Sequence, residues 1–325
     1  MTLLRAVFLV LSKYIWSIPV TMGIPGNILA ILVANRQHNR KLSPCVFMTA
    51  MAVADTVFLL EVLWFYSLYY PGHLDASFNK WARGMILTFH IFVIYTSGTI
   101  SGLYLAAMSI DRVIAVRFPM AAVRLCTTTR ARVVVINLTI PILVINVHLF
   151  FVYQYVEDLQ SGLRMLVYDV PVALENASSF YSIITGTVLP FLVILGSNSI
   201  IIATLKKASR ERFKLGTAID QKGTAKSHNL TAMLLFVSAA YIATTLPYRL
   251  YHPIMTIPQV AAVYDITQEY WRLRSGIGIF LVAVVWMCNY ATNFFLYCIG
   301  GGRRYRQDTK EVIGSLLKCA LNDKL

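Results

Sequence analysis

The sequence predicts an all-α membrane protein: a seven-transmembrane helix bundle with a short amphipathic helix after the seventh span. Of its 325 residues, 57% are hydrophobic and only 14% are charged, whereas soluble domains have about 25% charged residues. The mean hydropathy is +0.63. Seven mostly apolar windows each reach the roughly 20 residues that a helix needs to cross a bilayer.

The seven windows are spread along the whole chain, which favours one membrane domain over two soluble domains. They cover residues 14–34, 45–70, 84–111, 131–152, 179–205, 229–256 and 275–299. We therefore divide the chain into a short N-terminal segment (1–13), a seven-helix domain (14–300) and a C-terminal amphipathic helix with its tail (301–325).

The basic residues predict the orientation. Most of the 29 Lys and Arg residues follow the first, third and fifth windows or lie in the tail. Because basic loops stay on the cytoplasmic side, we expect a multi-pass plasma-membrane protein with an extracellular N-terminus and a cytoplasmic C-terminus. The net charge of +14 then reflects topology and contact with anionic membrane lipids, so nucleic-acid binding is not expected.

Three features concern disulfides and modification. All five cysteines fall within spans or on the predicted cytoplasmic side, so we expect no structural disulfide. Asn176-Ala-Ser lies before the fifth span, on the predicted outer side, and is a candidate glycosylation site. Residues 303–317 have the apolar spacing of a helix that lies on the inner leaflet, and Cys319 beyond them is either a palmitoylation site or a free thiol.

Polar residues within the spans indicate function. A charge at the bilayer centre costs about 2.5–3.5 kcal/mol on insertion scales, and Asp55 falls near the middle of the second span. Ser101 in the third span, with Asn289 and Asn293 on one face of the seventh, are placed to converge on it. Such a cluster forms either a site for a monovalent cation or water, or only a polar contact between helices. No other cofactor is expected.

The spans also contain prolines and an ion pair. Pro190 and Pro247 each remove a backbone hydrogen bond and favour a helix kink, which gives a helix alternative arrangements that a switch can use. Asp111-Arg112 ends the third span. Taken alone, this pair is also compatible with a simple interfacial anchor.

Six motifs follow one another in a fixed order on six of the spans. They are Gly26-Asn27, Ala54-Asp55, Ser109-Ile-Asp111-Arg112-Val113, Leu189-Pro190-Phe191, Thr245-Leu246-Pro247 and Asn289-Tyr-Ala-Thr-Asn293-Phe-Phe-Leu-Tyr297-Cys298. Together they resemble the rhodopsin-like (class A) G-protein-coupled receptors over about residues 14–310. The Asn-Phe-x-x-Tyr-Cys pattern of the last motif resembles invertebrate neuropeptide receptors of the FMRFamide type.

The resemblance implies a role for each motif. Asp111 would hold Arg112 at rest, and Arg112 would reach toward a heterotrimeric G protein on activation. Tyr297 would move inward with the seventh span. The same activation switch would include Asn293, Pro247 and Pro190.

The resemblance also implies that the Asp55 cluster, with Ser101, Asn289 and Asn293, is a sodium pocket that favours the inactive state. The chain also departs from the family, and three departures bear on the candidate sites. It has no cysteine at the outer end of the third span or in the 153–178 loop, Thr245 stands where a Trp is usual, and Phe294 stands where a Pro is usual.

The possible classes of ligand are limited mainly by residues that the spans lack. The third span has no aspartate at residues 92–96, where the family's amine receptors carry one, and residues 275–299 contain no lysine that could form a retinal Schiff base. The candidate ligand-binding residues are those in the outer halves of the spans: Glu61, Trp64, His90, Tyr95, Arg249 and His252. Arg249 requires a carboxylate, supplied either by Glu61 or by a ligand.

We therefore expect a receptor for a neuropeptide that activates a heterotrimeric G protein. One alternative is a receptor for an acidic or lipid-like small molecule or a chemosensory cue. A membrane transporter is the alternative from another class, although such proteins favour internal repeats that are absent here. No nucleophile-elbow, zinc or phosphate-loop pattern is present, so enzymatic activity is not expected.

Overall fold

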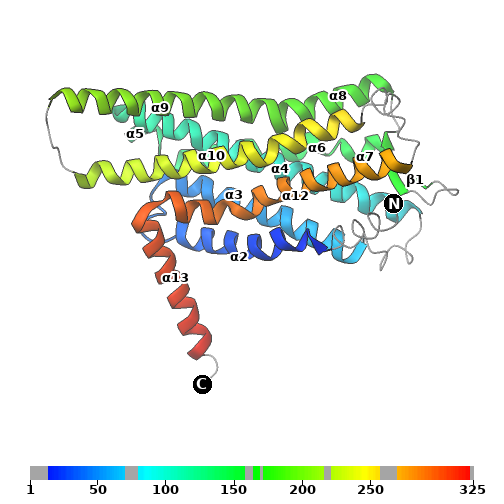
Figure 1. The fold of residues 1–325 in the computed structure, drawn as a ribbon, viewed down its shortest axis with the longest axis horizontal. Coiled ribbons are helices and arrows are strands. Elements are labelled where there is room, and N and C mark those ends of the chain that lie inside the picture. Colours follow the sequence, from blue (N-terminus) through cyan, green and yellow to red (C-terminus); the bar gives the residue numbers. More distant parts are fainter. Residues whose placement is uncertain are drawn as a thin grey trace.

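The computed structural model describes residues 14–69, 80–157, 164–168, 171–215, 221–256 and 269–322. Seven helices in this part of the chain are long and apolar enough to cross a membrane. They run side by side in one bundle (Figure 1), which confirms the predicted fold class. The spans are formed by α2 (Ser17–Ala34), α3 (Ser43–Trp64), α4 (Lys80–Arg117), α6 (Thr128–Asn146), α9 (Leu189–Leu215), α10 (Gln221–Thr256) and α12 (Glu269–Gly300).

Shorter elements extend or connect these helices. The π-helix η1 (Phe65–Tyr69) continues α3, and α5 (Pro119–Leu125) connects α4 to α6. The short helix α7 (Leu149–Val152) follows α6, while α8 (Val172–Ile183) and the π-helix η3 (Ile184–Val188) lead into α9. Pro190 is the second residue of α9, directly after η3. Isolated π-helical turns are frequent at functional sites.

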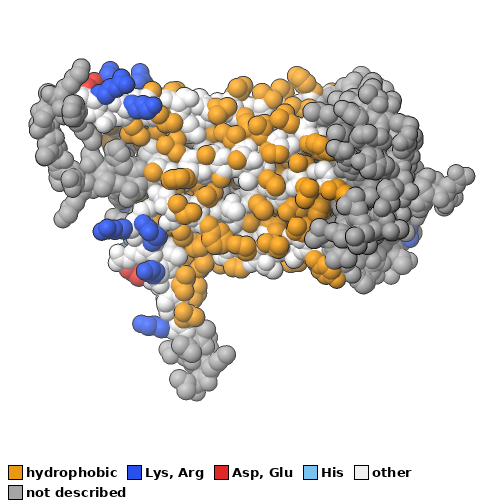
Figure 2. All heavy atoms as spheres, viewed as in Figure 1, with side chains coloured by type: hydrophobic (Ala, Val, Ile, Leu, Met, Phe, Trp, Pro, Cys, Tyr) orange, Lys and Arg blue, Asp and Glu red, His pale blue; other side chains and the backbone are white. Residues whose placement is uncertain are grey.

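The spans differ in how much of their surface the bundle covers. In α4, 72% of the most apolar stretch is buried, whereas only 17% is buried in the span Thr128–Val152. The α4 helix therefore runs through the interior and α6 lies at the periphery. Hydrophobic side chains are spread over the middle of the face shown in Figure 2. Such an apolar surface is unfavourable in water and is solvated by lipid chains.

One end of the bundle carries a concentration of Lys and Arg side chains (Figure 2). This basic end comprises the connection between α2 and α3, α5, the end of α9 and the C-terminal helix α13 (Gly302–Asn322). Its exposed basic side chains include Arg40, Arg124, Lys206, Lys207 and Arg303. The charge distribution that predicted the topology is therefore gathered at one end of the structure.

A two-stranded antiparallel hairpin lies between α7 and α8, which an all-α prediction did not include. It is formed by β1 (Tyr153–Glu157) and β2 (Arg164–Tyr168), with Tyr153 opposite Tyr168 and Glu157 opposite Arg164. Two short strands pair only when the fold brings them together. The hydropathy of a sequence window does not predict such pairing.

The amphipathic helix α13 leaves the bundle at a steep angle (Figure 1). Its first residue, Gly302, has φ 74°, a left-handed conformation that glycine adopts without a steric penalty and that turns the chain out of α12. Tyr305 and Val312 are buried, whereas Leu316 and Leu317 are exposed. The helix α13 confirms the amphipathic helix predicted after the seventh span. Its exposed apolar side chains suit a position at the membrane interface.

A buried carboxylate attaches α13 to the connection between α2 and α3. Asp308 Oδ2 lies 3.1 Å from Nε2 of His38 and accepts a hydrogen bond of 3.1 Å from Nδ2 of Asn39. Arg36 donates through Nη1 to the backbone oxygen of Asp308 at 3.3 Å, and its Nη2 lies 2.7 Å from Oε2 of Glu311. These contacts fix the direction of α13.

Replacing Asp308 with alanine is expected to loosen α13. The change removes the acceptor for His38 and Asn39, and a hydrogen bond to a charged group contributes about 1.5–3 kcal/mol. Hydrogen–deuterium exchange of the full chain should become faster across residues 302–322. Lys310→Ala, at an exposed position of the same helix, is the control; equal exchange in the two variants would contradict the assigned role.

Candidate functional site

The interior of the bundle contains a fully buried carboxylate with two neutral partners. Asp55 of α3 has no exposed surface. Its Oδ1 accepts a hydrogen bond of 2.6 Å from Ser101 Oγ on α4, and its Oδ2 accepts one of 2.7 Å from Asn293 Nδ2 on α12. Three helices therefore meet at one carboxylate, as the sequence predicted for Asp55, Ser101 and Asn293.

Asn289 does not join the Asp55 carboxylate, although it is buried one turn away from Asn293. Its Oδ1 lies 3.5 Å from the hydroxyl of Thr244 on α10, which donates at 2.7 Å to the backbone oxygen of Ala240 within its own helix. The structure therefore brings Ser101 and Asn293, but not Asn289, into hydrogen-bonding contact with Asp55. The place of Asn289 in a sodium pocket stays a prediction.

The Asp111–Arg112 pair of α4 is closed on itself. Arg112 donates from Nη2 and Nε to Asp111 Oδ2 at 2.6 Å and 3.2 Å. Ser43, at the start of α3, lies with its hydroxyl 2.8 Å and 3.0 Å from the two carboxylate oxygens. The ion pair is almost fully buried, with 11% of the Arg112 side chain and 9% of the Asp111 side chain exposed. Sequence reasoning missed the part played by Ser43.

A cysteine extends this cluster toward α5. Cys126 Sγ lies 3.4 Å from the backbone oxygen of Asp111, to which the thiol donates. Burial raises the pKa of the Cys126 thiol to about 11, and the nearby Asp111 carboxylate adds to the increase. The thiol is therefore protonated at neutral pH and acts as a donor beside the ion pair.

Tyr297 has no exposed surface, and among the described residues its hydroxyl has no hydrogen-bond partner. Its ring lies 6.1 Å from the ring of Tyr305, at the start of α13. A buried hydroxyl without a partner costs about 1–3 kcal/mol. An arrangement of α12 that supplies a partner would therefore be favoured by this residue.

The opposite end of the bundle contains a second buried acid, Glu61. Its Oε1 lies 3.2 Å from Nδ1 of His90, and both side chains are largely buried. The His90 ring stacks on Phe65 of η1, with 3.7 Å between ring centroids and 12° between planes. Of the two alternatives for Arg249, pairing with Glu61 is therefore not what the structure shows, because α3 packs against α4 and Glu61 pairs with His90.

Arg249 of α10 lies instead over an aromatic surface. Its guanidinium carbon is 5.5 Å from the ring centroid of Trp286 on α12. Trp286 stacks on Tyr248 with 4.3 Å between centroids and 1° between planes, and contacts Phe58 and Tyr290 edge-on. This cluster was not predicted from the sequence, although the four-residue spacing of Trp286 and Tyr290 in the seventh span places them on one helix face.

For the remaining predicted site residues, the structure gives their helix and, for some, their exposure. Trp64 and Tyr95 are partly buried. Pro247 lies within α10 and Pro190 at the start of α9. His252 lies on α10 and Asn176 on α8, with side chains outside the described part. Cys319 is exposed on α13, and all five cysteines are free.

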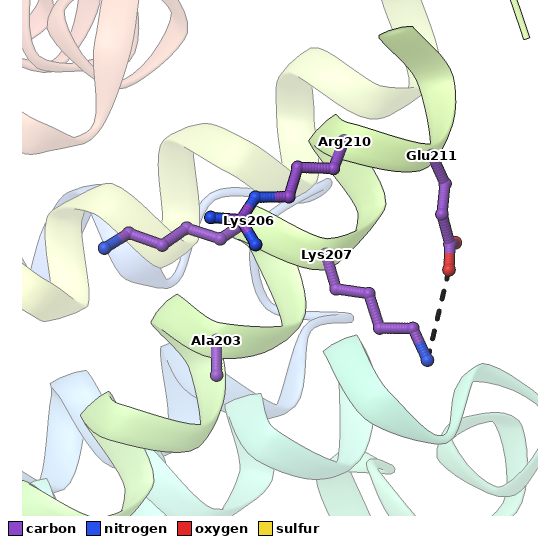
Figure 3. A pocket seen from close by; sticks show the side chains of 5 residues that line it. All are labelled: Ala203, Lys206, Lys207, Arg210 and Glu211. Atoms are coloured by element: carbon purple, nitrogen blue, oxygen red, sulfur yellow. Dashed lines mark ion pairs between the residues drawn. The ribbon is translucent and has the colours of Figure 1, made fainter. Parts of the chain in front are cut away.

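A basic hollow lies on the last turns of α9, at the basic end. Its volume is about 480 Å³, and it is lined by Ala203, Lys206, Lys207, Arg210 and Glu211 (Figure 3). Lys207 Nζ lies 3.9 Å from Glu211 Oε1, and Figure 3 shows Lys206 and Lys207 extending in different directions. The lining of the hollow therefore carries a net positive charge at the basic end of the bundle.

Seven apolar helices, a buried acid at their centre and an arginine pair at their basic end define a multi-pass membrane protein of the seven-helix receptor class. Residues 26–259 match the family described as 7 transmembrane receptor (rhodopsin family). The chain therefore belongs to the rhodopsin family of seven-transmembrane receptors.

Similar proteins include receptors for different kinds of ligand. The chain is 26% identical to the FMRFamide receptor of Drosophila melanogaster over 232 residues, which are 66% of this chain and 40% of the relative. It is 26% identical to neuropeptides B/W receptor type 1 of Mus musculus over 288 residues, covering 87% of this chain and 80% of the relative. It is 24% identical to mouse cysteinyl leukotriene receptor 1 over 243 residues, covering 72% and 63%. The chain thus spans less than two thirds of the first and third of these relatives.

Proposed function

We propose that the protein binds an extracellular neuropeptide and, when occupied, drives nucleotide exchange on a heterotrimeric G protein. The observation that carries this proposal is the closed Asp111–Arg112 pair at the basic end of α4. An arginine held by its neighbour is available to a partner only after the pair opens. Relatives named as FMRFamide and neuropeptides B/W receptors support the choice of a peptide.

The proposal places the protein in the plasma membrane with its basic end in the cytoplasm. The clustering of Lys and Arg at that end supports this orientation, because cytoplasmic loops retain positive charge. The N-terminus and the Arg249 region are then on the extracellular side. The amphipathic helix α13 lies against anionic lipids of the inner leaflet.

Activation is a shift between two packings of the same bundle. A ligand that contacts α10 and α12 more favourably in one packing increases its population by that difference in affinity. Pro247 lies within α10, and the π-helical turn η3 comes just before Pro190 of α9. At these two places α10 and α9 change direction most easily. Opening of the basic end exposes Arg112 and a groove that accepts a helix of the partner.

The Asp55 cluster is the proposed sodium pocket. A hard cation prefers oxygen ligands, and the Asp55 carboxylate and Ser101 hydroxyl fit that preference. Asn293 donates its amide nitrogen to Asp55, and the side-chain oxygens of Asn293 and Asn289 are the further candidate ligands. Bound sodium would neutralise the buried carboxylate and thereby favour the packing in which α3, α4 and α12 meet at it.

The test is a screen of synthetic neuropeptides, amidated and unamidated, against purified receptor and G protein. A peptide that binds should accelerate GTPγS loading of the G protein in the presence of the wild-type chain. Arg112→Gln should abolish the acceleration while leaving binding of the labelled peptide in place. Uptake of labelled solute into cells without any nucleotide exchange would instead favour a transporter.

A further inference from the structure

Arg249 is a partly buried cation of α10 with no acidic neighbour among the described residues. Its guanidinium makes no ion pair and no hydrogen bond with them, and its Nε is fully buried without a partner. The acid at the same end, Glu61, is engaged by His90. At least the Nε–H donor of this permanently charged group is thus buried without an acceptor.

The surroundings hold this guanidinium in place without neutralising it. The Trp286 ring supports one side. On another side is Gly186 of η3, where a Cβ would lie 3.3 Å from both Nη1 and Nη2 of Arg249 and 3.2 Å from Thr99 Oγ1. Because Gly186 has no side chain, the guanidinium reaches the backbone of η3. The cation is therefore located between α10, α12 and η3, while its hydrogen-bonding capacity is unused.

A partly buried guanidinium without a carboxylate partner matches one class of ligand group. Its planar fork pairs with the two oxygens of a carboxylate, and a low-dielectric site strengthens that pairing. A neutral amide offers a single acceptor oxygen and no charge. The stacked aromatic rings of Tyr248 and Trp286 beside it suit an apolar group next to the carboxylate.

We infer that Arg249 is the anchor for a carboxylate of the extracellular ligand, with an aromatic or other apolar group against Trp286. This inference rests on the proposed function for its biological ligand, but the binding itself does not require a G protein. The carboxylate belongs either to a free small acid or to a peptide terminus, and the two sources are distinguishable with small probes.

The experiment measures the melting temperature of the purified full-length chain in lipid nanodiscs. Sodium benzoate represents a free acid and N-acetylphenylalanine a peptide terminus; benzamide and N-acetylphenylalaninamide are their neutral counterparts. All titrations are made at one ionic strength with sodium chloride as the baseline. Binding to the folded state raises the melting temperature, and this readout does not depend on coupling.

We expect at least one of the two acids to raise the melting temperature and both amides to leave it unchanged. The acid with the larger shift indicates the source of the carboxylate. Arg249→Gln should lose the shift, and Arg249→Lys should keep part of it because the charge remains without the fork. Arg130→Gln, at an exposed arginine of α6, should behave as the wild type.

The ligand-free variants supply a second measurement. Removing a partly buried cation that has no acidic neighbour should raise the melting temperature of Arg249→Gln above that of the wild type, whereas loss of a structural contact would lower it. Equal shifts from acids and amides, no shift from either acid, or an undiminished acid shift in Arg249→Gln would overturn the inference. None of these results would alter peptide-driven nucleotide exchange, which tests the proposed function separately.

Discussion

Replacing Asp111 with asparagine is expected to raise ligand-independent nucleotide exchange on the G protein. In the structure the Asp111 carboxylate accepts both hydrogen bonds that hold Arg112 closed. A hydrogen bond to a charged group contributes about 1.5–3 kcal/mol, and every 1.4 kcal/mol is roughly a tenfold change in an equilibrium. The open population should therefore rise about ten- to a hundredfold, measured as basal GTPγS loading at equal receptor concentration.

Two further variants test the same assignment. Ser43→Ala removes one hydroxyl from the Asp111 carboxylate and leaves its charge on Arg112, so its basal exchange should rise less. Arg112→Gln combined with Asp111→Asn should return exchange to background, because the residue that is released is then missing. Basal exchange in Asp111→Asn that equals the wild type would refute the assignment of this pair as the resting lock.

Replacing Asp55 with alanine is expected to destabilise the bundle strongly. The change leaves the hydroxyl of Ser101 and the amide of Asn293 buried without their acceptor. Each unsatisfied buried group costs about 1–3 kcal/mol, so the free energy of unfolding should fall by about 2–6 kcal/mol. Thermal unfolding of the full chain in nanodiscs measures the loss.

A neighbouring residue provides the control for this variant. Thr56→Ala removes a hydroxyl that donates only within its own helix, to the backbone oxygen of Ala52, and should change stability little. Replacing sodium chloride by choline chloride should raise basal exchange of the wild type but not of Asp55→Ala. A sodium response that survives in Asp55→Ala would show that any sodium site lies elsewhere.

The number of spans, their order and the clustering of charge at one end were all predictable from the sequence. Each depends on a local property: twenty apolar residues in a row, or basic residues in one connection, have the same consequence in any membrane bundle. The convergence of Asp55 with Asn293, which are 238 residues apart, was also predictable. A charge near the bilayer centre needs polar neighbours, and few were available.

The choice among competing partners was not predictable. Glu61 pairs with His90 although Arg249 is also at that end. Asn293 bonds to Asp55, whereas no hydrogen bond joins Asn289 to Asp55 among the described residues. Ser43 joins Asp111 from the preceding helix. Each choice depends on the rotation and tilt of a helix about its own axis.

The sequence by itself therefore determined a seven-helix membrane bundle, its basic end and the residues with a charge to satisfy. Only the tertiary structure decided which of those charges are satisfied within the chain and which, like Arg249, are left for something else. The physical reason is that hydropathy belongs to a segment, whereas rotation and tilt are set by packing against neighbouring helices.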